Sequence, residues 1–139
     1  MTDSTPGKSR PFRRTRNDHA GETAEDYVEA ISDIVGQKKV CRVTDLAKLF
    51  GVSHVTVTKT ISRLQREGLV DTKPYGPLHL TAAGDKLATM SRKRHDLVLE
   101  FLMALGVSKS VAEVDSEGIE HHVSRETLQA FRRFIDEQA

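Results

Sequence analysis

The stretch that decides the fold is VTDLAKLFGVSHVTVTKTISRLQRE, residues 43–67. Thr44 can cap a short helix that carries leucine, alanine and phenylalanine, and Ser53 can cap a second helix that runs to Glu67. Between them, Gly51 begins a three-residue turn. Two short helices joined by such a turn are typical of a helix-turn-helix, although an ordinary helical hairpin with a solvated basic face would share much of this pattern.

The second predicted helix has two contrasting faces. Val57, Ile61 and Leu64 recur at helical spacing and form the stripe expected to be buried. The opposite face is small and polar in its first half and basic in its second half, which suits entry into a DNA major groove followed by phosphate contacts. Val55 would otherwise be an exposed valine, and contact with a thymine methyl group accounts for it. The candidate DNA-contacting residues here are Ser53, Val55, Thr56, Lys59, Ser62, Arg63 and Arg66.

A short hairpin is predicted directly after the second helix. The apolar segments 69–71 and 78–80 flank residues 73–77, KPYGP, whose proline and glycine content predicts a turn. A hairpin in this position is a wing, so the motif becomes a winged helix-turn-helix. Lys73 and Tyr75 at the tip are candidates for contact with the DNA backbone or minor groove.

Helical periodicity continues on both sides of this motif. A helix starting at Thr23 carries an apolar stripe, Thr81 opens a long helix that ends near Gly106, and Ser124 caps a last helix. The far half of the long helix and the last helix expose more apolar surface than a small winged domain can cover, which predicts a subunit interface. The apolar positions are Tyr27, Ile31, Ile34 and Val35 in the first helix, Leu87, Met90, Leu97, Phe101 and Leu102 in the long helix, and Leu128, Phe131, Phe134 and Ile135 in the last.

The predicted fold class is mainly α, in three parts. Residues 1–21 lack apolar periodicity and are rich in Arg, so we expect a flexible basic tail. Residues 22–84 are expected to form the N-terminal winged helix-turn-helix DNA-binding domain with a small β-hairpin wing. Residues 85–139 are expected to form an all-helical metal-binding and dimerisation domain.

Composition narrows the class of protein further. The net charge of the 139 residues is only +1, but residues 38–80 carry eight Lys or Arg and three Asp or Glu. Cys41 is the single cysteine, so no intramolecular disulfide can form and a reducing, cytoplasmic location fits. No apolar run approaches the ~20 residues of a membrane span, so no membrane partner is expected. The sequence has neither a nucleophile motif nor a phosphate loop, which argues against an enzyme.

The segment DSEGIEHHVS, residues 115–124, has the spacing of metal ligands. On a helix, Glu117, Glu120 and His121 project from one face within about 100° of arc. Two carboxylates and an imidazole, without a thiolate, suit a hard divalent ion such as Mn²⁺ or Fe²⁺ better than a structural zinc. His122 should point away from this site. A solvated acidic helix face would have the same spacing.

Three further residues are weaker candidates when each is taken alone. Asp26 and Glu29 lie three apart near the start of the first predicted helix, where acidic residues usually complement the helix dipole. His95 is a single histidine on the long helix, where a structural role is more common.

Five segments together resemble the diphtheria-toxin-repressor superfamily, and within it the manganese-responsive branch. They are EDYVEAI (25–31), VSHVTVTKTISRLQREGLV (52–70), LTAAG (80–84), KRHDLVLEFL (93–102) and EGIEHHVS (117–124). The resemblance covers residues 22–139 almost without gaps. It implies a metal site built from the first helix, the long helix and the E-x-x-E-H segment, with six ligands: Asp26, Glu29, His95, Glu117, Glu120 and His121.

The resemblance also implies which ion binds and what the binding does. The iron-responsive branch tends to carry Cys at the position of Glu117 and Met near Asp26, so manganese is favoured here, with one or two Mn²⁺ per subunit. Fe²⁺ and other divalent metals remain open. The expected function is a manganese-responsive transcriptional regulator, a metal-activated repressor of manganese uptake genes. It would bind a pseudo-palindromic operator in double-stranded DNA as a homodimer formed through the C-terminal helices.

Three other readings of the sequence stay open at this point. One is an iron-responsive regulator of the same superfamily, and another is a winged-helix regulator that does not respond to metal. The third is a di-metal hydrolase, because carboxylate and histidine clusters also hold catalytic metal pairs.

Overall fold

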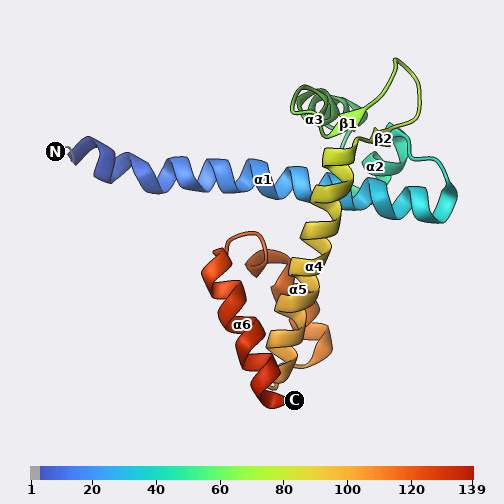
Figure 1. The fold of residues 1–139 in the computed structure, drawn as a ribbon. Coiled ribbons are helices and arrows are strands. Elements are labelled where there is room, and N and C mark those ends of the chain that lie inside the picture. The colour runs from blue at the N-terminus through green and yellow to red at the C-terminus, as the bar shows by residue number, and fades with distance from the viewer. Residues whose placement is uncertain (1–3) are drawn as a thin grey trace. The chain divides into compact units, whose positions relative to one another are not determined.

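The helix-turn-helix is present in the computed structural model, which describes residues 4–139, with side chains from residue 21 onward (Figure 1). The chain forms two compact units: Ala24–Arg92, and residues 93–139 with the part of α1 before Ala24. The described elements are α1 (Ser4–Lys38), α2 (Val43–Phe50), α3 (His54–Arg66), β1 (Val70–Asp71), β2 (His79–Leu80), α4 (Ala82–Ala104), α5 (Lys109–Ile119) and α6 (Arg125–Gln138). The predicted mainly helical fold class is confirmed.

The turn between α2 and α3 follows from two residues. Gly51 ends α2 with φ +65°, a left-handed conformation that glycine adopts without a Cβ penalty. Ser53 caps α3, because its Oγ accepts a hydrogen bond from the backbone N–H of Thr56 at 3.1 Å. The sequence therefore located both the turn and the start of α3.

The start of α2 differs from the predicted cap at Thr44. The helix begins at Val43, and Arg42 stands at its N-cap. Asp45 closes the first turn, since its carboxylate accepts from the Arg42 N–H at 2.9 Å and from Lys38 Nζ at 2.7 Å. These two hydrogen bonds, with Lys38 the larger cause, hold the pKa of Asp45 below its usual value. A carboxylate at the third residue of a helix reaches the backbone N–H of the N-cap, which the shorter side chain of a threonine at the second residue does not.

The core of the Ala24–Arg92 unit is built around α3. Val57, Ile61 and Leu64 are all buried, as the predicted stripe requires. α1 contributes Tyr27, whose ring stacks on Phe50 of α2 with the centroids 4.7 Å apart. The full buried cluster is Ala24, Tyr27, Ala30, Ile31, Cys41, Leu46, Ala47, Val57, Ile61, Leu64, Val70 and Leu78.

The wing is a two-stranded antiparallel hairpin in which Val70 pairs with Leu80. It is joined to the chain before α2, because Leu78 N–H donates to the Cys41 carbonyl at 2.8 Å. Tyr75 at the tip is fully exposed and has φ +61°. Burial raises the pKa of the Cys41 thiol to about 11, so the thiol stays protonated at neutral pH and acts as a small apolar side chain.

In the second unit, aromatic packing joins α4 to α6. The ring of Phe101 stacks on Phe131 with centroids 3.8 Å apart and meets Phe134 edge-on at 5.6 Å. Ser124 caps α6 as predicted, with its Oγ accepting from Thr127 N–H at 3.1 Å. These contacts pack the apolar face of α6 against α4. None of the helices in residues 4–139 is long and apolar enough to span a membrane.

The N-terminal segment differs from the predicted flexible tail. α1 begins at Ser4 and not at Thr23, so the backbone of residues 4–21 continues the helix, and residues 1–3 lie outside the described part. Extending a helix that is already nucleated costs little compared with starting one. Pro6 lies in the first turn, where the N–H would have no intrahelical partner. α4 also runs through residues 84 and 85, where the sequence analysis divides the two domains.

We expect Gly84→Ala to lower the free energy of unfolding by about 1–3 kcal/mol. A Cβ at Gly84 would lie 2.1 Å from the Leu69 carbonyl oxygen and 3.2 Å from Leu80 Cδ2, so either α4 or the strand before it must shift. Urea denaturation followed by circular dichroism measures the change.

Gly118→Ala is the matched control, because Gly118 also lies inside a helix but a Cβ there meets no described atom within 4 Å. It should raise the free energy of unfolding by up to about 1 kcal/mol. Equal stability of Gly84→Ala and the wild-type protein would contradict the close approach of α4 to Leu69.

Candidate metal centre

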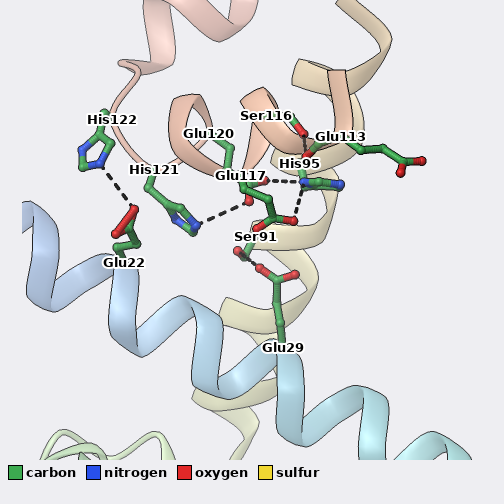
Figure 2. Close-up of polar contacts among 10 residues, drawn as sticks. All are labelled: Glu22, Glu29, Ser91, His95, Glu113, Ser116, Glu117, Glu120, His121 and His122. Atoms are coloured by element: carbon green, nitrogen blue, oxygen red, sulfur yellow. Dashed lines mark hydrogen bonds and ion pairs between the residues drawn. The ribbon is translucent and has the colours of Figure 1, made fainter. Parts of the chain in front are cut away.

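Three of the six predicted ligands lie together in the unit that contains residues 93–139. His95 Nδ1 on α4 lies 3.1 Å from Glu120 Oε2 and 3.9 Å from Glu117 Oε1 (Figure 2). One ligand atom from each residue falls within 4.8 Å of the other two. Atoms bound to one divalent ion at about 2.0–2.6 Å must come about this close to one another. This cluster therefore has the dimensions of a metal centre.

Glu120 is the deepest member of the cluster. Its side chain is 2% exposed, whereas that of His95 is 22% exposed and that of Glu117 is 65% exposed. The side chain of His121 is also buried, and its Nε2 lies 3.4 Å from the second carboxylate oxygen of Glu120. Burying a carboxylate is costly unless a positive charge or a donor accompanies it. Two imidazoles beside a buried carboxylate make a donor set that fits a divalent ion.

The helical face predicted for these ligands is only partly present. α5 ends at Ile119, and Glu120 is its C-cap with φ −59° and ψ −28°. Because the N–H of Glu120 still donates to Ser116 at 3.0 Å, Glu117 and Glu120 keep their helical relation. His121 lies in the turn that follows, and this turn brings its ring to Glu120.

His122 makes a separate contact away from the cluster. Its Nε2 lies 3.4 Å from Glu22 Oε2 on α1, and both side chains are partly exposed (Figure 2). His122 was predicted not to be a ligand, and it pairs elsewhere. Glu22 was not singled out in the sequence.

Asp26 and Glu29, the two ligands predicted from the first helix, lie on α1 in the Ala24–Arg92 unit. Glu29 accepts a hydrogen bond from the hydroxyl of Ser91 on α4. Sequence reasoning missed Ser91, because a serine within a helix gives no pattern that marks it. The membership of Asp26 and Glu29 in the ligand set stays a prediction.

The surface predicted to contact DNA is exposed on α3 and the wing. The side chain of Val55 is 63% exposed, and only Arg63 among the predicted residues of α3 is partly buried. Ser53 has a second use, because its hydroxyl caps α3. The predicted residues on this surface are Ser53, Val55, Thr56, Lys59, Ser62, Arg63, Arg66, Lys73 and Tyr75.

A cavity of about 780 Å³ lies between α3 and the wing. Its lining contains Arg42, His54 and Lys73 but no carboxylate. Gln65 Nε2 donates to the Thr72 carbonyl at 3.4 Å and so links α3 to the wing beside this cavity. Sequence analysis did not find Arg42 or His54, which lie outside the exposed basic face of the second predicted helix.

Two models of known protein families match the chain, one in each half. Residues 19–78 match the N-terminal DNA-binding domain of the iron-dependent repressors, and residues 81–138 match their metal-binding and dimerisation domain. The transcriptional regulator MntR of Escherichia coli O157:H7 is 49% identical over 123 residues, which cover 88% of this chain and 79% of that protein. The chain belongs to the MntR branch of the iron-dependent repressor family. MntR of Salmonella typhimurium is 45% identical over 126 residues, or 91% of this chain and 80% of that protein.

Solved structures give the same family. A manganese-dependent transcriptional repressor in complex with manganese is 29% identical, with a TM-score of 0.70, over 81% of this chain and 52% of that one. The manganese regulator SloR is 25% identical, also with a TM-score of 0.70, and the match covers 81% of this chain and 53% of SloR. The present chain thus spans about half the length of these two proteins. As a member of the MntR branch, it is a metal-responsive DNA-binding transcriptional regulator and not an enzyme.

We expect Glu120→Ala to bind Mn²⁺ more than about 100-fold more weakly than the wild-type protein. Changes next to a metal ligand typically cost 10–100-fold, and Glu120 is a buried member of the cluster itself. A titration of metal-free protein, with free Mn²⁺ followed by its paramagnetic resonance signal, measures the loss.

Glu113→Ala is the control for Glu120→Ala, since Glu113 is an exposed carboxylate on the same helix α5. It should bind Mn²⁺ like the wild type. Glu120→Gln keeps the side-chain volume and guards against loss of folding. Normal binding by both Glu120 variants would rule out the cluster as the metal centre.

Proposed function

We propose that this protein is a manganese-activated repressor of manganese uptake genes, acting in the cytoplasm. Its homodimer would bind a pseudo-palindromic operator when one or two Mn²⁺ are bound per subunit. The observation that carries the proposal is the cluster of His95, Glu117 and Glu120 in a chain whose other unit is a winged helix-turn-helix. The proposed ligands are Asp26, Glu29, His95, Glu117, Glu120 and His121.

The donor set favours manganese over softer metals. The six proposed ligands offer four carboxylates and two imidazoles, and Mn²⁺ prefers such oxygen and nitrogen donors. Cys41 is buried in the other unit with a raised pKa and does not offer a thiolate. Because raw affinity rises from Mn²⁺ to Fe²⁺ and beyond, the coordination geometry must supply the preference. Iron sensing is therefore the second candidate, and it would use the same residues.

Charge explains why metal would control the protein. Four carboxylates repel one another when no cation is near, so Asp26 and Glu29 would be held loosely by the segment that carries Glu117 and Glu120. A bound divalent ion supplies the positive charge that removes this repulsion. Asp26 and Glu29 would then tie the DNA-binding unit to the other ligands and fix the spacing of the two recognition helices in the dimer. Linkage requires that DNA tighten metal binding by the same factor, about 5- to 150-fold for a typical coupling.

Different residues of the exposed surface would contact different parts of the DNA. Val55 and Thr56, in the first turn of α3, are placed to meet base edges, and Lys59 and Arg66 farther along are placed to meet phosphates. Lys73 and Tyr75 would contact the backbone or minor groove from the wing. The cavity between α3 and the wing suits a sugar–phosphate strand, because it carries cationic side chains and no carboxylate.

The homodimer would form through exposed apolar side chains of the unit that contains residues 93–139. Met103 and Leu105 at the end of α4 are 43% and 54% exposed, and Val111 and Val114 on α5 are 50% and 72% exposed. Large apolar side chains that are this exposed are candidates for a protein–protein interface. The family's second matched domain is described as metal-binding and dimerisation, which supports a second copy of this chain as the partner.

DNA binding should require Mn²⁺ and be lost in a chelator, because without metal the spacing of the recognition helices is not fixed. With Mn²⁺ present, Lys59→Ala should weaken binding to all sequences. It should also reduce the slope of log K against log salt concentration by about two, because each dimer loses two phosphate contacts. Fluorescence anisotropy with a labelled pseudo-palindromic duplex, at several salt concentrations, measures both effects.

Lys109→Ala removes the same charge from α5, which is not in the unit that contains α3 and the wing, and should leave the salt slope unchanged. DNA binding of equal strength in Mn²⁺ and in chelator would favour the metal-independent regulator instead. A stronger response to Fe²⁺ than to Mn²⁺ under anaerobic conditions would favour the iron-responsive one.

Val114→Glu should convert the dimer to a monomer, since it places a charge in the proposed apolar interface. Sedimentation velocity gives the mass directly. Val55→Glu changes an equally exposed valine on α3 and should remain dimeric while losing operator binding. A dimeric Val114→Glu protein would exclude this face of α5 from the interface.

A further inference from the structure

Ser91 on α4 makes a partly buried polar contact with α1. Its side chain is fully buried, and its hydroxyl donates to Oε1 of Glu29 (Figure 2). Both residues belong to the Ala24–Arg92 unit. The contact therefore lies within the compact unit that also contains the helix-turn-helix.

Local structure does not require a serine at this position. Gly84, Ala88 and Ser91 are all buried and follow one another at helical spacing, so they share one face of α4. Alanine has the higher helix propensity and would fit a position that demands only a small side chain. Serine inside a helix usually bonds a backbone carbonyl of the preceding turn or points to solvent. Here the hydroxyl instead bonds a carboxylate on another helix.

The neighbouring contact between the same two helices has a different character. Arg92 lies 2.6 Å from Asp33, but their side chains are 44% and 55% exposed. Exposed ion pairs of this kind contribute little and are screened by salt. Ser91 and Glu29 thus make a contact that is partly buried, while Arg92 and Asp33 form a solvated pair at the surface.

We propose that Ser91 is a positioning residue that holds the Glu29 carboxylate as a metal ligand. A carboxylate has about four acceptor sites, so a hydrogen bond from Ser91 can orient the group without occupying all of them. Hydrogen bonds to ligating carboxylates orient them and tune their affinity for metal. Ser91 also lies four residues before His95, on the same face of α4. The inference rests on the proposed role of Glu29 in the metal site.

Ser91→Ala should bind Mn²⁺ about 10-fold more weakly, the scale expected when the partner of a metal ligand is removed. The probe is Mn²⁺ alone, titrated into the full-length metal-free protein and followed by paramagnetic resonance. The urea midpoint of the metal-free variant is measured in parallel. Ser116→Ala is the matched control, because Ser116 is equally buried in a helix but donates to the backbone carbonyl of Glu113; it should bind Mn²⁺ normally.

A double-mutant cycle with Glu29→Gln separates positioning from a merely structural effect. If Ser91 acts through Glu29, Ser91→Ala should have no further effect on Mn²⁺ affinity once Glu29 is replaced. Equal losses in both backgrounds, or an unchanged affinity of Ser91→Ala, would overturn the proposal and leave Glu29 as a ligand. Normal affinity of Glu29→Gln would remove Glu29 from the ligand set, which is a failure of the proposed site itself.

Discussion

The burial of the Glu120 carboxylate is the constraint on which the metal-binding half of the protein depends. A charged group at 2% exposure needs compensation, and His95 from α4 and His121 from the turn after α5 both lie against it. The Glu120 side chain therefore joins the end of α5 to α4 and to the turn that follows α5.

The sequence predicted the parts of the fold that local chemistry decides. Gly51 and Ser53 fix the turn of the helix-turn-helix because one tolerates positive φ and the other bonds the next helix. The predicted stripe of α3 is buried because its period matches the helix. Residues 4–21 were predicted less well, because composition does not reveal that a helix starting within a packed core can extend beyond it.

The residue types of the candidate site could be predicted from the sequence, but their arrangement in space could be predicted only in part. Spacing identified Glu117, Glu120 and His121, but it could not show that α5 ends before the histidine or that Glu120 is deeply buried. Those features depend on packing between segments far apart in the chain. The resemblance to a family contributed His95, which spacing alone did not support. Neither residue spacing nor the family resemblance indicated Ser91, because its hydroxyl contacts Glu29, which lies 62 residues away in the sequence.

The raised pKa of Cys41 bears on what the regulator can sense. A thiol that stays protonated and buried at neutral pH is a poor target for peroxide or disulfide exchange, and it is the single cysteine of the chain. The proposed ligands are carboxylates and imidazoles, which resist the oxidation that disables thiolate sites. A regulator with such ligands would still respond to its metal when the redox state of the cell changes. Its response to metal would then be independent of oxidants.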